Sequence, residues 1–301
     1  MSGETTTTLS NYIFTDYSDE VRKTHYQGTP LINFFGVRPQ EKTGDSMDWI
    51  VESAGYTAYN YTEGSTPPSP QSQTSVSLTL GFKYCWTVAK ITGHAVDALR
   101  NGFLDPVNKA MDDAVNAVNY KCETNMVASF IAAIDDDTTY GGANRAAYNL
   151  ASVVVDGGGV ALTGAKLDSL REGVKLRPKD NDGGDLVYLS APEQLTAYAE
   201  ISGTAYNEIN YVHGAGDGVY DISRIKPSMR YAGAPWYEIP TMTNTYVFLT
   251  RKSDVVIEEH RPITFKMLGA VDDADMILVS RSMEMKHYDP YRAGRIELLS
   301  T

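Results

Sequence analysis

Apolar and polar residues alternate without a break in one segment of the chain, near residue 80. Seven apolar side chains occupy every second position there: Val76, Leu78, Leu80, Phe82, Tyr84, Trp86 and Val88. Because successive side chains of a β-strand point to opposite faces, a period of two predicts one long strand with a single apolar face. At about 3.3 Å per residue, that strand would be roughly 40 Å long.

A shorter alternating segment precedes this strand, in which Met47, Trp49 and Val51 are separated by other residues. A turn-rich stretch separates the two segments, and it contains Glu63, Gly64, Pro67 and Pro68. We therefore predict an extended hairpin over residues 47–91. A two-stranded ribbon is marginally stable alone in water, so we expect its tip to lie on a neighbouring subunit. The alternative is two ordinary strands of a compact sheet joined by a loose loop.

A longer period follows the hairpin and is typical of a helix. Apolar residues recur every three or four positions, which marks one helical face: Val107, Met111, Ala114, Val115, Val118, Cys122, Met126, Phe130 and Ala133. Asp105 supplies a capping side chain, and Pro106 suits the first helical position. The pattern predicts a helix over residues 106–134, about 44 Å long at 1.5 Å per residue. Val107, Met111, Val118 and Met126 are expected in its core face.

The rest of the chain predicts shorter elements. Helices are expected to begin at Thr163 and Pro192, and Gly233 and Pro235 lie in a predicted turn between strands. Strands are predicted at residues 186–189, 246–249, 255–257, 263–267, 276–279 and 295–299. Residues 1 to about 28 are polar with scattered aromatic rings, which indicates an extended arm, or alternatively a frayed terminus.

Length and charge limit the classes of function. A chain of 301 residues that is 42% hydrophobic can bury a sizeable core, and two packed lobes are expected at this length. The 38 Asp and Glu outnumber the 26 Lys and Arg, giving a formal charge of −12. This sign opposes tight binding of DNA by the bulk surface. A wall that encloses DNA without adhering to it would tolerate such a charge.

Cysteine usage and hydropathy favour a reducing cytoplasm over secretion. Cys85 and Cys122 are the only cysteines and form no C-x-x-C pair, which opposes a disulfide scaffold. The first ten residues lack the pattern of a signal peptide, and no eighteen consecutive residues are apolar. We expect no membrane span.

Motifs of known chemistry give little support for catalysis. The glycines at residues 157–159 and 214–218 lack the following Lys-Ser/Thr of a phosphate loop, so plain loops are favoured. Residues 180–185 are rich in oxygen ligands but lack the downstream Glu of a calcium loop, which favours an ordinary turn. Residues 135–137 could bind a cation, but a solvated helix end is the simpler interpretation.

The five histidines are far apart in sequence, which leaves open only a catalytic triad that the fold brings together in space. We predict no catalytic, cofactor-binding or metal site, and no enzyme.

The order of arm, long hairpin, long helix and mixed region resembles the Hong Kong 97-type capsid fold of tailed bacteriophages. Short phrases in the same order are similar to segments of that family: residues 58–64 with 75–78, 187–192, 231–235, 258–264 and 288–293. Together they cover nearly the whole chain. The resemblance implies an α+β fold with an N-terminal arm, an extended loop, a spine helix, a peripheral domain and an axial domain.

The resemblance also divides the chain. It implies an arm at residues 1–46, the extended loop at 47–91, a peripheral domain at 92–180 that contains the helix 106–134, an axial domain at 181–260, and return strands at 261–301 that complete the peripheral domain. The extended-loop residues expected in assembly are Trp49, Glu63, Gly64, Pro67, Pro68, Leu78, Leu80, Phe82, Tyr84 and Trp86. Gly233 and Pro235 are expected in the axial-domain turn.

The implied function is that of a major capsid protein, whose hexamers and pentamers form an icosahedral head enclosing double-stranded DNA without sequence-specific binding. The expected location is the virion, assembled in the host cytoplasm, with a portal and a decoration protein as further partners. The arm begins near Met1, so we expect a separate scaffolding protein. Residues 48–78 contain no lysine, which opposes covalent cross-linking through the loop. The alternatives are an encapsulin-like compartment and a carbohydrate-binding domain that uses the 20 tyrosines.

Overall fold

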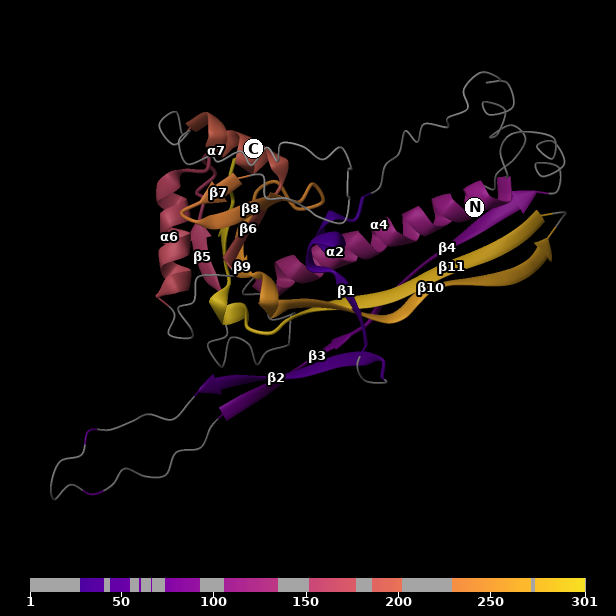
Figure 1. The fold of residues 1–301 in the computed structure, drawn as a ribbon, viewed down its shortest axis with the longest axis horizontal. Coiled ribbons are helices and arrows are strands. Elements are labelled where there is room, and N and C mark those ends of the chain that lie inside the picture. Colours follow the sequence, from indigo (N-terminus) through magenta and orange to yellow (C-terminus); the bar gives the residue numbers. More distant parts are fainter. Residues whose placement is uncertain are drawn as a thin grey trace, which may run out of the picture.

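The chain folds into an elongated α+β molecule, which confirms the predicted class (Figure 1). The computed structural model describes residues 28–40, 44–54, 60, 66, 74–92, 106–134, 152–176, 186–201, 229–271 and 274–300. One end holds a six-stranded sheet with two helices. The other end holds a long, narrow sheet with one long helix along it.

The long sheet has four strands in the order β1-β10-β11-β4. Their bounds are Val37–Pro39, Val255–Val271, Ala274–His287 and Lys83–Thr92. Strand β11 pairs antiparallel with both β10 and β4, while β1 runs parallel to the first part of β10. Since β10 and β11 follow each other in the chain, they form a long ribbon that sets the length of this part of the molecule (Figure 1).

Helix α4 spans Pro106–Ile134, the bounds predicted from the apolar period. It lies along one face of the long sheet and contacts β4 and β11 (Figure 1). Its buried residues continue the predicted stripe: Ala110, Ala114, Val118, Cys122, Met126, Val127, Phe130, Ala133 and Ile134. Met111 is partly buried against the same cluster, and the side chain of Val107 lies outside the described residues. Burial of this stripe stabilises the helix, because propensity alone contributes little.

The second sheet has six strands in the order β5-β12-β9-β6-β8-β7. Their bounds are Val153–Asp156, Gly294–Glu297, Val247–Arg251, Leu186–Ser190, Ala234–Glu238 and Met229–Tyr231. Helices α6 (Gly164–Lys175) and α7 (Pro192–Ile201) belong to this end of the molecule (Figure 1). A second core cluster, which includes Tyr188 and Trp236, lies beneath them. Short helices α2, η3 and η4 span Pro30–Phe35, Lys252–Asp254 and Pro290–Arg292.

The predicted single strand over residues 76–88 is wrong, because the chain changes sheets within it. Strands β2 (Ser46–Ala54) and β3 (Thr74–Gly81) pair antiparallel as a separate ribbon, whereas β4 joins the long sheet. Phe82 lies between β3 and β4, and its N–H donates to the carbonyl of Asp45 at 3.2 Å. Since each sheet has its own buried side, the buried positions change from even to odd residue numbers after Phe82.

The phase shift is visible in the burial of individual side chains. Leu78 and Phe82, at even positions, are buried. Beyond the break, the odd positions Cys85 and Ile91 are buried instead, and Tyr84 and Trp86 are exposed. An unbroken alternation in the sequence therefore describes two strands with opposite buried faces.

The strand order of the two larger sheets crosses the predicted domain bounds at several places. Strand β5 and helix α6 fall in the segment 92–180 but lie with the six-stranded sheet, and so does β12 from the segment 261–301. Strand β10 begins at Val255, inside the segment 181–260, yet belongs to the long sheet. The apolar period of a strand predicts which of its faces is buried, but it does not predict which other strand pairs with it. The identification of these units as peripheral and axial domains stays a prediction.

The C-terminal end of α4 is held by side chains that flank the six-stranded sheet. Arg295 of β12 donates from Nη1 to the carbonyl of Ile134 at 2.8 Å, and the Ser152 hydroxyl donates to the same oxygen. A buried guanidinium at this end also complements the negative pole of the helix dipole. Arg295 therefore couples the long helix to the second sheet.

Candidate assembly surface

Large apolar side chains are exposed on the strands of the hairpin and the long sheet. The set on these strands is Ile50 of β2, Tyr84 and Trp86 of β4, and Phe265, Met267 and Leu268 of β10. Trp86 is 67% exposed and Met267 65%. Exposed apolar patches that group together mark interaction sites more often than single residues do.

Trp86 lies on the face of the long sheet that points away from α4. Its register partner on β11 is Ser280, which pairs in turn with Thr264 of β10, and paired residues share a face. The next row on this face contains Val88 and Leu278, both only partly buried. The surface formed by Tyr84, Trp86, Val88 and Leu278 is called the open face.

The outer edge of β10 is the second exposed feature. Strand β1 pairs with β10 only at residues 257–259, so among the described strands the segment 261–271 pairs with β11 alone. A long edge strand presents backbone N–H and C=O groups that can pair with another chain. Phe265 and Met267 on this edge are partners of Val279 and Ile277, so they point to the α4 side of the sheet.

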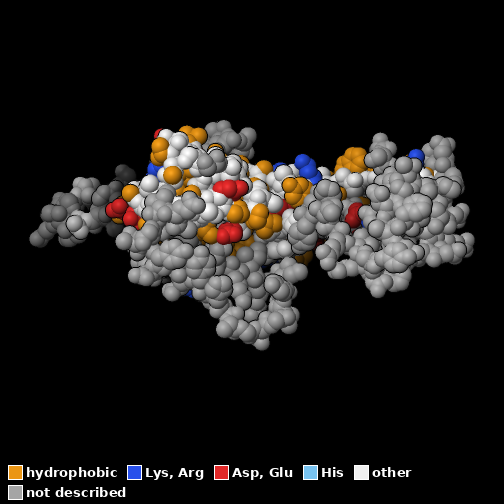
Figure 2. Space-filling model, turned by 90° about the horizontal axis from the view of Figure 1, so that it is seen from above, with side chains coloured by type: hydrophobic (Ala, Val, Ile, Leu, Met, Phe, Trp, Pro, Cys, Tyr) orange, Lys and Arg blue, Asp and Glu red, His pale blue; other side chains and the backbone are white. Residues whose placement is uncertain are grey.

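A hollow of about 310 Å³ lies beside this edge, at the end of the sheet where α4 begins. Its lining is mostly apolar and consists of Ile91, Met111, Phe265, Met267, Asp275 and Ile277. Figure 2 looks down on the molecule from above Figure 1 and shows hydrophobic and acidic side chains next to each other over the described residues. The β10 edge and the open face therefore expose apolar side chains on two sides of one sheet.

The hairpin residues predicted for assembly separate into three groups. Trp49, Leu78 and Phe82 are buried in the larger core cluster of their own chain, and Leu80 is partly buried against it. Tyr84 and Trp86 are exposed, so they remain available to another molecule. The tip residues Glu63, Gly64, Pro67 and Pro68 lie outside the described residues.

A histidine that the sequence did not single out for this role joins the base of the hairpin to β10. His260 stacks on Phe82 with ring centroids 5.0 Å apart and meets the edge of Tyr84 at 6.0 Å. Its Nδ1 lies 2.7 Å from Oε1 of Gln40, and its Nε2 lies 3.8 Å from the Asp45 carboxylate. These contacts fix the point where the chain leaves the ribbon for the long sheet.

Glu123 attaches the segment before β1 to the long helix. Its carboxylate accepts the N–H of Leu31 at 2.7 Å and of Ile32 at 3.0 Å, at the start of α2, and the Thr241 hydroxyl at 2.8 Å. Thr29 gives α2 no side-chain cap, so Glu123 satisfies N–H groups that would otherwise lack acceptors. Burial raises the pKa of Glu123, and the three hydrogen bonds oppose that rise.

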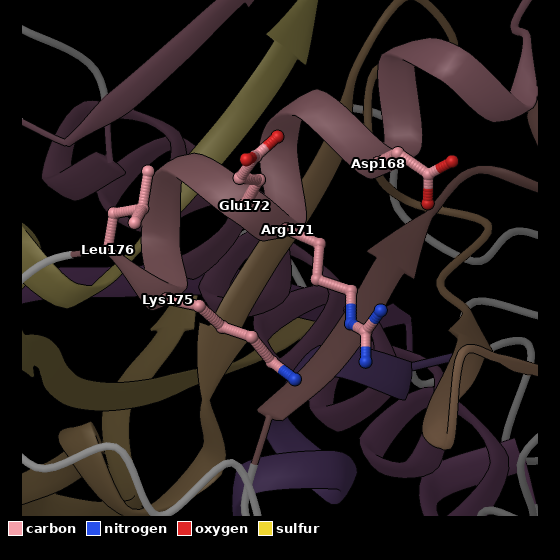
Figure 3. Close-up of a pocket in the computed structure, with 5 residues that line it drawn as sticks. All are labelled: Asp168, Arg171, Glu172, Lys175 and Leu176. Carbon is pink, nitrogen blue, oxygen red and sulfur yellow. The ribbon is translucent and has the colours of Figure 1, made fainter.

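A second hollow, of about 370 Å³, lies beside α6, and its described lining residues come from this helix and its C-cap (Figure 3). The lining residues are Asp168, Arg171, Glu172, Lys175 and Leu176. Asp168 accepts the Tyr231 hydroxyl at 2.8 Å. Mixed charges on successive turns of one helix are typical of a solvated face, and the lining residues that the structure describes include no pair of nucleophile and base.

The predicted turn near Gly233 joins β7 to β8. Tyr231 pairs with Ala234, and Ala232 and Gly233 have φ values of 48° and 87°. Two positive φ values in a two-residue loop are typical of a type I′ hairpin, which favours glycine. Pro235 follows in β8 and pairs with Arg230.

Within the ranges that the structure describes, no three His, Cys, Asp or Glu side chains are grouped to hold a metal ion. Among the same residues, no helix is both long and apolar enough to cross a membrane.

Neither a protein-family model nor a curated protein sequence matches the chain. Solved structures match it over its whole length. The capsid asymmetric unit of Cyanophage A-1(L) is 15% identical, with a TM-score of 0.74 and coverage of 99% of this chain and 100% of that one. The capsid of the native GTA particle is 10% identical, with a TM-score of 0.68 and coverage of 99% and 100%. The holo-SrpI encapsulin complex from Synechococcus elongatus PCC 7942 is 12% identical, with a TM-score of 0.61 and coverage of 100% and 97%. The chain therefore has the fold that these capsid proteins and the encapsulin share.

Proposed function

We propose that this chain is a major capsid protein, and that many copies assemble into an icosahedral shell around the double-stranded DNA of a tailed phage. The observation that carries the proposal is the full-length likeness to the Cyanophage A-1(L) capsid protein.

The exposed apolar strands support assembly. Closed shells need the same interfaces repeated around symmetry axes. Trp86 on the open face and Met267 on the β10 edge provide apolar area that their own subunit leaves in water. Covering such area contributes about 25 cal/mol per Å², so several weak contacts together stabilise a shell.

The partners in this proposal are further copies of the chain, arranged as hexamers and pentamers, with a separate scaffolding protein, a portal and a decoration protein. The formal charge of −12 supports enclosure of DNA without sequence-specific binding. The expected location is the virion, after assembly in the host cytoplasm.

An encapsulin-like compartment is the second candidate, because the holo-SrpI encapsulin complex matches the chain over its full length. The contents of the particles distinguish the two functions. Particles purified from the native source are treated with nuclease, opened, and assayed for protected DNA and for other proteins by mass spectrometry. Protected double-stranded DNA supports the capsid. A single abundant cargo enzyme without DNA supports the compartment and contradicts the capsid.

A further inference from the structure

The only two cysteines of the chain, Cys85 of β4 and Cys122 of α4, lie in the same core cluster, where the helix packs on the strand. Cys85 is 3% exposed and Cys122 is fully buried. Cys85 occupies one of the odd positions of β4 that face the helix. The two residues are separated in sequence by the end of β4 and the first half of α4, so the fold and not the local sequence brings them together.

Contacts one turn to either side place Cys122 over Cys85. Asn125 donates from Nδ2 to the Cys85 sulfur at 3.2 Å. Arg281, the register partner of Cys85 on β11, donates from Nη1 to Oδ1 of Asn119 at 2.8 Å. Residues three apart on a helix share a face, so Cys122 lies between these two anchors and on the same side.

The neighbouring thiols have pKa values that shift in opposite directions. The Cys122 thiol and the Asn125 amide next to the Cys85 sulfur lower the pKa of Cys85 to about 7 against the effect of burial, and Lys121 and Lys83 add to the lowering. The neighbouring Cys85 and burial raise the pKa of Cys122, which keeps its proton. A thiolate fraction at neutral pH makes Cys85 the nucleophile of the pair.

We propose that Cys85 and Cys122 are a redox-sensitive latch that closes as an intramolecular disulfide between β4 and α4. The inference goes beyond the proposed shell function and does not depend on it. A reducing compartment keeps both residues as thiols, and an oxidising medium joins the helix to the strand.

The oxidant is a low-molecular-weight disulfide, and the exchange balances in two steps. Because Cys85 is buried, a local opening of the contact between β4 and α4 must first expose its sulfur. The Cys85 thiolate then attacks one sulfur of oxidised glutathione, forms a mixed disulfide and releases one glutathione thiolate. Cys122 then loses its proton, attacks the Cys85 sulfur and displaces the second glutathione. Two protein thiols are oxidised to one disulfide, and one glutathione disulfide is reduced to two thiols. The sulfur atoms must approach each other to about 2.05 Å.

The test uses the full-length protein, folded and incubated with oxidised glutathione at neutral pH. The expected result is loss of both free thiols, a mass lower by about 2 Da for the two hydrogens, and a peptide that joins Cys85 to Cys122. A crosslink across the intervening chain restricts the unfolded state, so we expect Tm to rise by roughly 5 to 10 °C and to fall back after reduction.

Cys85→Ser and Cys122→Ser are the matched controls, since each leaves one thiol that cannot close the ring. They should show no crosslinked peptide and no rise in Tm. If a variant folds poorly, the presence or absence of the Cys85–Cys122 peptide in the wild-type protein still decides the test. Two unreacted thiols after prolonged oxidation, a stable glutathione adduct, or disulfides only between different copies would overturn the latch.

Discussion

Glu123 is a buried carboxylate whose two oxygens join three separate parts of the chain. It contacts the start of α2 and the Thr241 hydroxyl from its place in α4. In sequence it stands in a row with Val127, Phe130 and Ile134, all of which are buried. A charged residue at a position of the buried helical face can therefore be recognised in the sequence as a buried carboxylate. Its hydrogen-bond partners could not be predicted, because Leu31 lies 92 residues away.

The raised pKa of Glu123 predicts how it changes stability with pH. Between the ordinary pKa and the raised one, the folded chain binds more protons than the unfolded chain. Its contribution is therefore complete below the ordinary pKa and is lost as the pH rises through the folded value. Glu123→Gln removes this titration, so the free energy of unfolding of the wild type should fall relative to the variant as the pH rises above the ordinary pKa of a glutamate.

Urea denaturation at several pH values measures this difference. The glutamine keeps one acceptor oxygen and loses the other, which gives an offset that does not vary with pH. The change with pH is therefore the quantity to compare. Glu193→Gln, at an exposed position of α7, is the control and should follow the wild type. Parallel curves for wild type and Glu123→Gln would contradict the account.

Arg295 gives a second prediction at this scale. Replacing it with methionine keeps most of the apolar stem but removes the bond to the Ile134 carbonyl and the ion pair with Glu297 at 3.0 Å. We expect a loss of about 2 to 3 kcal/mol in the free energy of unfolding, because hydrogen bonds from charged groups are the stronger ones. Arg38→Met, at an exposed position of β1, should change it by less than about 0.5 kcal/mol. Equal effects of the two substitutions in urea denaturation would show that Arg295 does not couple α4 to the sheet.

At the scale of the element, α4 and the hairpin show what a sequence pattern can and cannot predict. The bounds of α4 follow from local signals, namely a helical period and a proline at the first position. The returning strand has an equally regular period, yet it breaks at Phe82. Its first half pairs with β2 and its second half with β11, and these partners are far away in sequence. Pairing partners of this kind decide which side of a strand is buried.

The open face gives the prediction that belongs to this scale. Trp86→Glu places a charge on an exposed position of β4, so the subunit should fold with a free energy of unfolding within about 0.5 kcal/mol of the wild type. Assembly should fail, because the charge would be buried without a partner between copies. Val160→Glu, also at an exposed position but away from the long sheet, is the matched control.

Size-exclusion chromatography of the purified proteins separates the outcomes. The wild type and Val160→Glu should elute as large particles, and Trp86→Glu as small species with a normal circular dichroism spectrum. Normal particles from Trp86→Glu would exclude the open face from the contacts between copies.

At the scale of the whole molecule, the described residues form a long sheet, a six-stranded sheet and the separate β2–β3 ribbon. Helix α4 lies along the long sheet, and Arg295 holds its C-terminal end to the six-stranded sheet. The sequence order of arm, hairpin, helix and mixed region was enough to predict the fold class. It did not predict that β5 and β12 join the six-stranded sheet, because parallel pairing of these strands leaves no mark in a local pattern. The exposed strands of the long sheet are what an assembly of such subunits would cover.

Electron cryomicroscopy of the purified full-length protein tests this claim most directly. The account predicts closed icosahedral shells in which neighbouring copies cover Trp86 on β4 and Met267 on the edge of β10. A monomer at high concentration, or shells in which both side chains remain in solvent, would contradict it.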